Sequence, residues 1–503
     1  MTIYCIRFVL TLDSPLHIGS GADSFETDST VVRDVFGHYR VPGTSLAGVL
    51  RHALAEHAGE EAASALFGHA GRGADAPSGS RVAISDGYLL DFDGRPCIDK
   101  ILEGSQPRFP AATAVQDCVR LDNETLTAAD AGKFDLEYVP QGTRFAVEMV
   151  YEPHGMRPDN AGAAVAGADR PFAHVLFLLQ LLQAGLVQIG GGTTRGMGHV
   201  HAEKIIIRGF DLHDAAGRDA WRNRPYALDA TISGGQPIQF PQTIAAPCAG
   251  SEKPDEETLS GRIVLRLKAD GPLLIGGNQS PLKKAQSLNA DITFSEFLTV
   301  DYAKGQLTPV AAVPGSSLKG ALHHRVRHIL ACLGAADVEG TITEIFGCIG
   351  QMPRKGHVGV AGCLLPDQTY TQVQHVAIDR LTGGALAGAL YSEAPIWRDG
   401  LQLQVTISLD RLPLHCAGLL LHALLDLGQG RLPIGNGVGR GNGRLVFADA
   451  GLKAVDEKSS FILYKAERIG VADGGKIENL QADAVAAFER EFCKGAEHAA
   501  AAG

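Results

Sequence analysis

The chain has 503 residues, 45% hydrophobic and 20% charged, so it is too long for one ordinary domain and too apolar for a disordered or fibrous protein. Its formal net charge of −11 argues against a protein that coats nucleic acid by bulk positive charge, so RNA binding would depend on backbone amides, glycine loops and a few placed arginines. Nine scattered cysteines without a CxxC pair exclude a disulfide framework and indicate a reduced, cytoplasmic protein.

The chain opens with an alternating pattern over Thr2–Leu16, which predicts a β-strand and lacks the continuous apolar stretch of a signal peptide. A glycine turn at Pro15–Gly19, a second strand and a Pro-Gly turn at Val41–Gly48 follow. A helix is expected to begin at this turn, where the hydroxyls of Thr44 and Ser45 suit an N-cap.

A long helix is predicted over 172–184, where glutamines interrupt the apolar run as they would in a buried amphipathic helix. The glycine-rich run Ile189–Gly198 and the β pattern His199–Ile207 close this half. No segment offers the roughly 20 uninterrupted apolar residues that span a bilayer, so we expect no membrane partner.

The second half repeats the motifs of the first half in the same order. The matched pairs are Pro15–Gly19 with Pro272–Gly276, Val41–Gly48 with Val313–Gly320, Leu66–Gly68 with Ile345–Gly347, Val119–Thr125 with Val376–Thr382, and Ile189–Gly198 with Ile434–Gly443. The hydroxyls recur at Ser316 and Ser317, and a long helix is expected at Leu414–Leu427. Each copy therefore reads as an α+β domain with a split βαβ or ferredoxin-like sheet.

The domain boundaries follow from the repeat. We expect a first domain at 1–221, a linker rich in Pro, Gly and Ser at 222–260, and a second domain at 261–450. The C-terminal extension 451–503 has no counterpart in the first copy. One short helix is predicted within it, at Ala482–Phe492.

The two glycine-rich runs could bring backbone N–H groups close to a phosphate. They are neither Walker loops nor dinucleotide fingerprints, because no Gly-Lys-Ser/Thr closes them and they follow a helix. Arg195 and Arg440 occupy the same place in both runs and suit a phosphate or a flat base. The plainer interpretation is a tight turn with a surface arginine. The glycines concerned are Gly190, Gly191, Gly192, Gly435 and Gly437.

The strings LHIGSG, YRVPGTSLAGVLR and GGGTTRGMG, with VPGSSLKGALHHR and IGNGVGRGNG in the second half, resemble the RAMP superfamily. In particular they are similar to the backbone subunits of type III CRISPR effectors, in a tandem form as in type III-D-like systems. The resemblance implies two RNA-recognition-like palms, each with a β-hairpin thumb at about 119–148 and 376–405. It also implies binding of guide RNA and cleavage of complementary single-stranded target RNA at regular intervals, beside other backbone and capping subunits.

In active members of this family an aspartate lies between the first glycine motif and the Pro-Gly-Ser motif, which here is Asp28. Such a carboxylate can hold a divalent cation, expected to be Mg2+, or help deprotonate a 2′-OH. In the second copy the Asp-x-Thr spacing favours Asp291. If Asp301 is aligned with Asp34 instead, the position falls near Glu296.

His17 matches a family position that contacts the guide, and Arg33 is also expected to bind RNA. Arg51, Lys319 and Arg325 fit phosphate contacts, although a solvated helix face explains each of them as well. Leu274 replaces His17 in the second copy, which casts doubt on identical guide contacts in the two halves. Two weaker patterns could bind a metal. His324 and His328, at i and i+4, lack a third ligand with a sensible spacing, and the spacing of Cys348, His357 and Cys363 fits no standard finger. We interpret both as structural.

Two alternatives to the target-cleaving backbone subunit stay open at this point. The first is a scaffold that binds guide and target RNA without cutting; Asp28 argues against it for the first copy only. The second is a RAMP ribonuclease that processes guide precursors on its own. The thumb-like segments in both halves suit an elongated backbone better.

Overall fold

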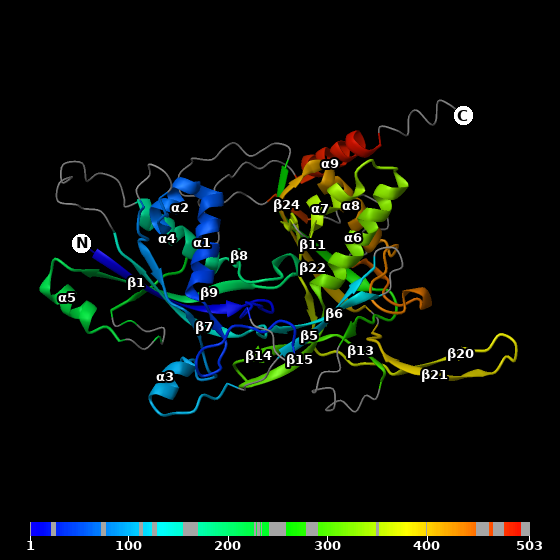
Figure 1. Ribbon diagram of the computed structural model, residues 1–503, viewed down its shortest axis with the longest axis horizontal. Helices are drawn as coiled ribbons and strands as arrows, with labels where there is room; N and C mark the ends of the chain where they lie inside the picture. The colour runs from blue at the N-terminus through cyan, green and yellow to red at the C-terminus, as the bar shows by residue number, and fades with distance from the viewer. Residues whose placement is uncertain are drawn as a thin grey trace.

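The computed structural model describes residues 2–21, 27–71, 77–109, 114–122, 128–153, 170–225, 228, 232, 234–240, 258–277, 290–348, 352–398, 400–448, 462–465 and 477–493. Two α+β units lie side by side along the longest axis (Figure 1). Among the described residues, no helix is both long and apolar enough to cross a membrane.

The first unit is built on one antiparallel sheet with the path β10-β9-β1-β7-β4-β2. Its central strands β9, β1, β7 and β4 stand in the order 4-1-3-2 of a ferredoxin-like sheet, with a helix after the first strand and another after the third. The strands are β1 (Thr2–Leu12), β2 (Arg40–Val41), β3 (Val82–Ile84), β4 (Gly87–Leu89), β7 (Arg144–Tyr151), β8 (Val187–Gln188), β9 (His199–Asp211) and β10 (Gln236–Pro237).

Helices cover one face of this sheet (Figure 1). In α1 (Gly43–Ala58), Leu46, Leu50 and Leu54 recur every four residues and are fully buried, as an amphipathic helix over a sheet requires. They meet the inward side chains of β1 and of α4 (Arg170–Gln183) in one core. Three shorter helices belong to this unit: α2 (Glu60–Phe67), α3 (Cys97–Leu102) and α5 (Ala215–Arg222).

The second unit repeats this plan with the path β18-β22-β11-β23, the same 2-3-1-4 order read from the other edge. Most of α8 (Leu414–Gly428) is buried, because α9 (Ile477–Phe492) packs along it on the side away from the sheet. The palm strands are β11 (Thr258–Ala269), β18 (Val358–Val360), β22 (Gln402–Pro413) and β23 (Leu445–Phe447). The helices are α6 (Gly315–Cys332), α7 (Val338–Phe346), α8 (Leu414–Gly428) and α9 (Ile477–Phe492).

A β-hairpin leaves each palm. The first pairs β5 (Ala114–Leu121) with β6 (Ala128–Tyr138), and the second pairs β20 (Val373–Ile378) with β21 (Ala385–Ala394). Both begin earlier and end earlier than the predicted thumbs, because β7 and β22 are palm strands. Apolar and polar residues alternate in the same way along thumb and palm strands, so the sequence pattern does not tell one kind of strand from the other.

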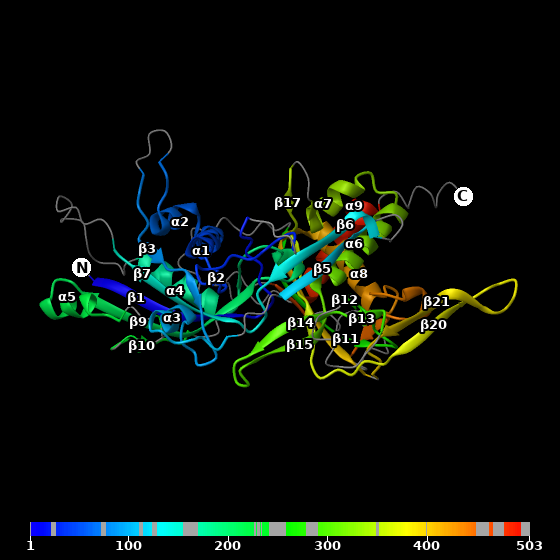
Figure 2. The same cartoon turned by 60° about the horizontal axis from the view of Figure 1, so that its bottom comes forward.

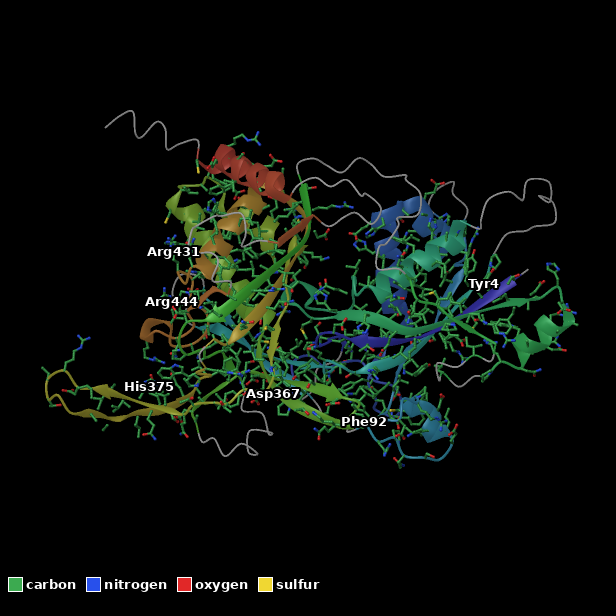
Figure 3. The ribbon with its side chains drawn as sticks, turned by 180° about the vertical axis from the view of Figure 1, so that it is seen from behind. Tyr4, Phe92, Asp367, His375, Arg431 and Arg444 are labelled. Atoms are coloured by element: carbon green, nitrogen blue, oxygen red, sulfur yellow. The ribbon has the colours of Figure 1, made fainter. Side chains whose placement is uncertain are left out.

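The two hairpins have different surroundings (Figures 1 and 2). The first lies across the second unit, where Tyr138 and Leu136 pack with Phe297. The second projects away from both units and carries His375 (Figure 3). A further hairpin, β14 (Glu296–Asp301) with β15 (Gln306–Val313), reaches back to the first unit, and Tyr302 at its turn donates a hydrogen bond to the carbonyl of Leu90. The two units interlock.

The segments outside the repeats are partly built into the palms. Within the predicted linker, β10 pairs with β9, and Ile238 and Phe240 pack against the first core. β11 begins at Thr258, and residues 241–257 lie outside the described residues. In the C-terminal extension, β24 (Ile462–Lys465) pairs with β11, and α9 begins five residues before the predicted helix.

The predicted hydroxyl N-caps are wrong. Pro42 and Pro314 occupy the N-cap positions of α1 and α6, so the N-cap residue itself makes no side-chain hydrogen bond to either helix. In α1 the amide of Gly43 donates to Asp86 Oδ1 at 2.8 Å, a residue on the neighbouring strand connection. A partner distant in sequence satisfies this orphan amide, so the local hydroxyls are not needed.

Candidate nucleic-acid interface

The segment that carries Asp28 runs along the base of the first hairpin. Ser29 forms a parallel bridge with Leu136, and Asp28 Oδ2 accepts a hydrogen bond from the backbone amide of Asp135 at 2.9 Å. The Asp28 side chain is exposed, whereas Thr27 beside it is buried. One carboxylate is thus held at a defined place on the strand that leads into the thumb.

Two further acidic side chains lie close to Asp28. Asp117 and Asp135 are cross-strand partners on the hairpin. The pKa of the Asp135 carboxyl is raised, first by its hydrogen bond with Asp117 and then by burial and the negative charges of Asp117 and Asp28. Gathered carboxylates of this kind attract a hard divalent cation, which prefers oxygen ligands. Sequence reasoning missed both, because only strand pairing brings them to Asp28.

Equivalent backbone contacts anchor the two palms to their hairpins. Leu16 exchanges two backbone hydrogen bonds with Val139, and Leu273, its counterpart in the repeated motif, does the same with Ile396. Val139 and Ile396 therefore mark the same point in the two copies, just beyond β6 and β21.

From these anchors the two aspartates can be compared by register. Asp135 stands four residues before the first anchor, and Ser392 stands four residues before the second. Asp291 Oδ2 accepts a hydrogen bond from the amide of Ser392 at 2.7 Å, as Asp28 does from Asp135. Asp28 and Asp291 thus occupy equivalent positions in the two copies.

Glu296 stands elsewhere in this register. The carbonyl of Ile18 accepts from Val32 and that of Ile275 accepts from Ser295, so Glu296 corresponds to Arg33. Its carboxylate accepts a hydrogen bond from the hydroxyl of Tyr370 at 2.6 Å.

The Asp291 carboxylate is exposed and tightly hydrogen-bonded. The amide and the hydroxyl of Ser392 both donate to it, and these bonds lower its pKa. Asp291 is therefore ionised at neutral pH. Ser392 stands where the first copy has Asp135, and its cross-strand partner Gln374 stands where the first copy has Asp117. The second copy therefore lacks both carboxylates that neighbour Asp28 in the first.

His17 supports the segment that carries Asp28. Its side chain is buried, Nδ1 donates to the carbonyl of Glu137 at 2.8 Å, and Nε2 accepts from the hydroxyl of Ser29 at 3.1 Å. Arg33 pairs with the buried carboxylate of Glu137 and stacks 4.4 Å over the ring of Tyr39. The geometry assigns both a role in holding this segment on β6, and their contact with RNA stays a prediction.

The glycine-rich runs pack on the turns that follow the first strand of each palm, Pro15–Gly19 and Pro272–Gly276. Gly190 and Gly435 have φ of +80° and +86°, and a Cβ would meet the carbonyls of His17 and Leu274 at 2.3 and 2.2 Å. Only glycine fits there. Both runs follow a helix and precede a strand, as predicted, and each forms one 3-10 turn, η2 (Thr193–Arg195) and η4 (Val438–Arg440).

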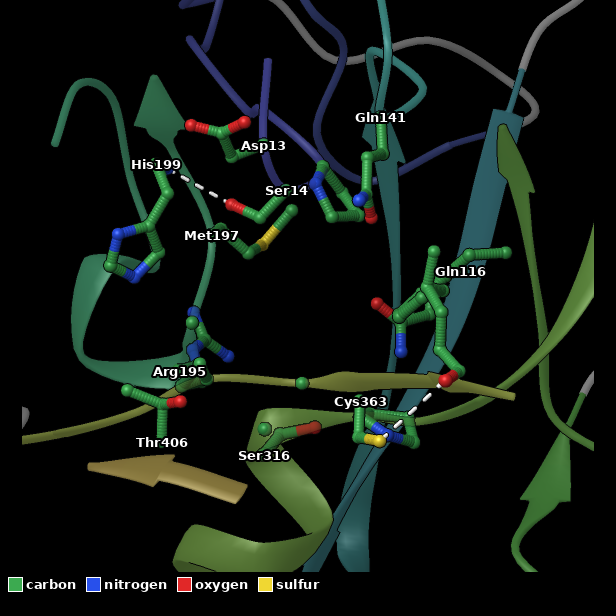
Figure 4. Close-up of a pocket in the computed structure, with 18 of the residues that line it drawn as sticks. Asp13, Ser14, Gln116, Gln141, Arg195, Met197, His199, Ser316, Cys363 and Thr406 are labelled. Carbon is green, nitrogen blue, oxygen red and sulfur yellow. Dashed lines mark hydrogen bonds between the residues drawn. The ribbon is translucent and has the colours of Figure 1, made fainter. Parts of the chain in front are cut away.

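The two equivalent arginines have different environments. Arg195 lines a cavity of about 400 Å³ between the units, together with Gln116 on the hairpin and Ser316 at the start of α6 (Figure 4). Arg440 forms an ion pair with the buried Glu393 and lies 5.7 Å from the ring of Tyr391 on the projecting hairpin.

Lys319 is the one other predicted RNA contact that the fold brings to this interface. Burial and the nearby charge of Arg195 lower its pKa to about 8. Arg51 and Arg325 lie apart, in ion pairs with Glu60 and Asp426 on their own units.

Sequence reasoning missed two exposed arginines beside the second glycine run. Arg431 and Arg444 are exposed by 68 and 56%, and they form ion pairs with Asp426 and Asp270. Figure 3 shows Arg431 and Arg444 on the second unit. Their proximity to the glycine run in sequence was the available signal.

The predicted structural interpretation of the weak metal patterns agrees with their geometry. Cys348, His357 and Cys363 each bond to a different backbone carbonyl, at Met352, Asp410 and Leu364. Within the described parts of the chain, the cluster of potential metal ligands lies instead at Glu344, His415 and Cys416.

Comparison with known proteins gives two matches. The model of the RAMP superfamily matches residues 9–201 and 266–446, one stretch in each palm. A curated relative, the CRISPR system Cms endoribonuclease Csm3 of Enterococcus italicus, is 28% identical over 225 residues, which is 41% of this chain and 92% of that protein. The double match confirms the predicted duplication.

Proposed function

This chain belongs to the RAMP superfamily, and on that basis we propose that it is a tandem backbone subunit of a type III CRISPR ribonucleoprotein. In this proposal it binds guide RNA and cleaves the complementary target RNA at two positions, one per palm. The observation that carries the proposal is the pair of equivalent carboxylates, Asp28 and Asp291, each held by a backbone amide beside a hairpin.

The proposed chemistry needs a nucleotide that the thumb has taken out of the duplex. An A-form helix keeps the 2′-OH away from in-line attack on the adjacent phosphorus, and a displaced nucleotide can reach that geometry. The carboxylate then orients the 2′-OH or accepts its proton. A divalent cation held by Asp28, with Asp117 and Asp135 near it, would neutralise charge on the phosphate. Their oxygen donors fit Mg2+.

The partners we propose are guide RNA, single-stranded target RNA and neighbouring subunits of the same family. The support is that the first hairpin and first glycine run lie against the second palm, whereas the second hairpin and second glycine run have no such neighbour within the described chain. A neighbouring RAMP domain seated on them would repeat the internal contact.

The test uses the assembled complex with a defined guide and an end-labelled target. Asp28→Ala should erase one product band and Asp291→Ala another, each lowering its rate by about 10²–10⁴, and EDTA should remove both bands. Assembly and target binding should be unchanged, since both aspartates are exposed side chains.

Asp301→Ala is the matched control, because that aspartate also caps backbone amides in a loop and lies outside the proposed sites. If the double variant Asp28→Ala with Asp291→Ala still yields both product bands, the chain is a scaffold that does not cut. Cleavage of precursor repeat RNA by the isolated chain would instead support the guide-processing alternative.

A further inference from the structure

Three side chains of different chemistry meet in the second unit, away from Asp28 and Asp291. The Glu344 carboxylate, the His415 imidazole and the Cys416 thiol have ligand atoms within 4.8 Å of one another. Cys416 Sγ lies 3.8 Å from Glu344 Oε2 and its residue is fully buried, whereas Glu344 and His415 are half-buried. The cluster therefore lies at the edge of the core, with a side open toward the surface.

The local fold explains why these residues meet. Glu344 lies in the last turn of α7, and His415 and Cys416 lie in the first turn of α8. Pro413, the last residue of β22, occupies the N-cap position of α8. A turn that begins beside another helix's end lets two consecutive side chains face the same carboxylate. Glu344 lies 72 positions before Cys416 in the sequence, so no local motif predicts the cluster.

The C-terminal helix covers this cluster. The ring of Phe492 on α9 lies 5.9 Å from the ring of His415, and the charge of Glu491 acts on the Cys416 thiol. The site thus has contributions from α7, α8 and α9, and α9 belongs to the extension that the first copy lacks.

We propose that Glu344, His415 and Cys416 bind one zinc ion, which fastens α9 to the second palm. Thiolate, imidazole and carboxylate together are ligands that zinc accepts and that harder cations such as Mg2+ and Ca2+ do not select. Zinc–ligand bonds of about 2.0–2.3 Å place tetrahedral ligand atoms roughly 3.3–3.8 Å apart, a small contraction of the observed cluster. Glu491 or a water molecule supplies the fourth ligand.

The surroundings of the thiol suit a divalent cation. The Glu344 carboxylate lies 3.8 Å from Cys416 Sγ, and the charge of Glu491 also acts on this thiol. Coordination would release the thiol proton to solvent, and the divalent ion would compensate the carboxylates and the thiolate. The positive end of α8 would add to the stability of the thiolate.

The experiment strips the purified full chain with a chelator and titrates it with Zn2+, and with Co2+ as a spectroscopic probe. We expect one ion per chain and a cobalt–thiolate charge-transfer band. Cys416→Ser and His415→Gln should each weaken zinc binding by at least about tenfold. If Cys416→Ser does not fold because its side chain is buried, His415→Gln still tests the site.

Two matched variants serve as controls. His422 lies on the same helix and contacts Phe488 of α9 at 4.7 Å, and Cys363 is a buried thiol of the same unit. His422→Gln and Cys363→Ser should bind zinc as the wild type does. A second readout is hydrogen exchange, which should rise in α9 when zinc is removed from the wild type.

Three results would overturn the proposal. The first is that the wild-type chain takes up no zinc. The second is that His415→Gln binds zinc with unchanged affinity. The third is that hydrogen exchange in α9 is the same with and without zinc.

Discussion

At the scale of single residues, equivalent positions in the two copies have different surroundings. Arg195 faces the other palm, and Arg440 pairs with Glu393 beside the free hairpin. Lys319 replaces Ala47 of the first copy and lies near Arg195, where its charge is partly desolvated. Duplicated side chains thus acquire distinct electrostatics once one copy is packed against the other.

The lowered pKa of Lys319 gives a pH-dependent prediction. The folded value is about 8 and the ordinary value is 10.5, so the side chain is charged at neutral pH and becomes neutral in the folded chain as pH rises through 8. Its phosphate contact should then be lost, which weakens guide-RNA affinity by roughly tenfold at about pH 9. Lys319→Arg stays charged and should lose less affinity over the same range.

The sign for folding is opposite. Between 8 and 10.5 the unfolded chain binds a proton that the folded chain does not, so this residue makes the fold more stable as pH rises. Filter-binding titrations of the wild type and of Lys319→Arg, at neutral pH and at about pH 9, check the predicted loss of guide-RNA affinity. If the affinities of the two proteins fall in parallel as pH rises, the prediction is contradicted.

At the scale of elements, the glycine runs show why a repeated motif need not be only a ligand site. Gly190 and Gly435 let each run lie on the turn after the first palm strand, where Gly191 and Asn436 donate to the carbonyls of His17 and Leu274, each at 2.7 Å. The first role of these glycines is close packing. The turn η2 also packs against β18 and α6 of the second palm, whereas η4 is exposed and could meet RNA.

We therefore expect Gly190→Ala and Gly435→Ala to destabilise the chain by at least about 1–3 kcal/mol each, because of positive φ and contact with a carbonyl. Gly439→Ala lies in the same run with open space around its Cβ and should stay within about 0.5 kcal/mol. Denaturant titration compares the three. Equal stabilities would show that the runs tolerate side chains at all three positions.

The projecting hairpin is the other element with a testable role. It exposes apolar side chains that a solvated hairpin does not need. They are Val376, Ile378, Leu381, Leu386 and Leu390, exposed by 45, 57, 97, 50 and 67%.

Replacing Leu381 and Leu390 by Ser should leave the isolated fold intact and reduce incorporation of the chain into the ribonucleoprotein, as native mass spectrometry would record. Leu102→Ser removes a leucine that is 74% exposed on α3 and should assemble normally. Undiminished assembly of the double variant would remove the hairpin from the subunit interface.

At the scale of the whole molecule, the two palms are joined by polar contacts buried between hairpins. Tyr138 accepts a hydrogen bond from the amide of Leu298 at 3.0 Å, and burial raises its pKa to about 12. Tyr302 accepts from the amide of Arg144 at 3.1 Å and donates to the carbonyl of Leu90 at 2.9 Å. These bonds fix the orientation of one palm on the other.

The variant Tyr138→Phe with Tyr302→Phe leaves these backbone groups without their partners, at a cost of about 1–3 kcal/mol for each group left buried. The palms should then unfold in two separate calorimetric transitions, where the wild type unfolds in one. Tyr391→Phe, on the projecting hairpin, should behave as the wild type. A single unshifted transition in the double variant would mean that apolar contacts alone join the palms.

The sequence by itself determined the duplication, the α+β order of each palm and the family, because these depend on local signals. Hydrophobic periodicity, the Pro-Gly turns and the glycine runs each act within a few residues, and they recur in the same order. The motif spacing was also enough to choose Asp28 and to favour Asp291 over Glu296, a choice with which the register of the hairpin strands agrees.

Only the tertiary structure decided which surfaces of the two copies meet and which stay open. The acidic neighbours of Asp28, the different environments of Arg195 and Arg440, and the cluster at Glu344 and Cys416 join residues far apart in sequence. Such contacts depend on strand register and on how hairpins pack across palms. Composition and motif spacing do not predict these contacts. The free energy that favours the contacts comes from burial between distant segments, and not from the local preferences of each segment.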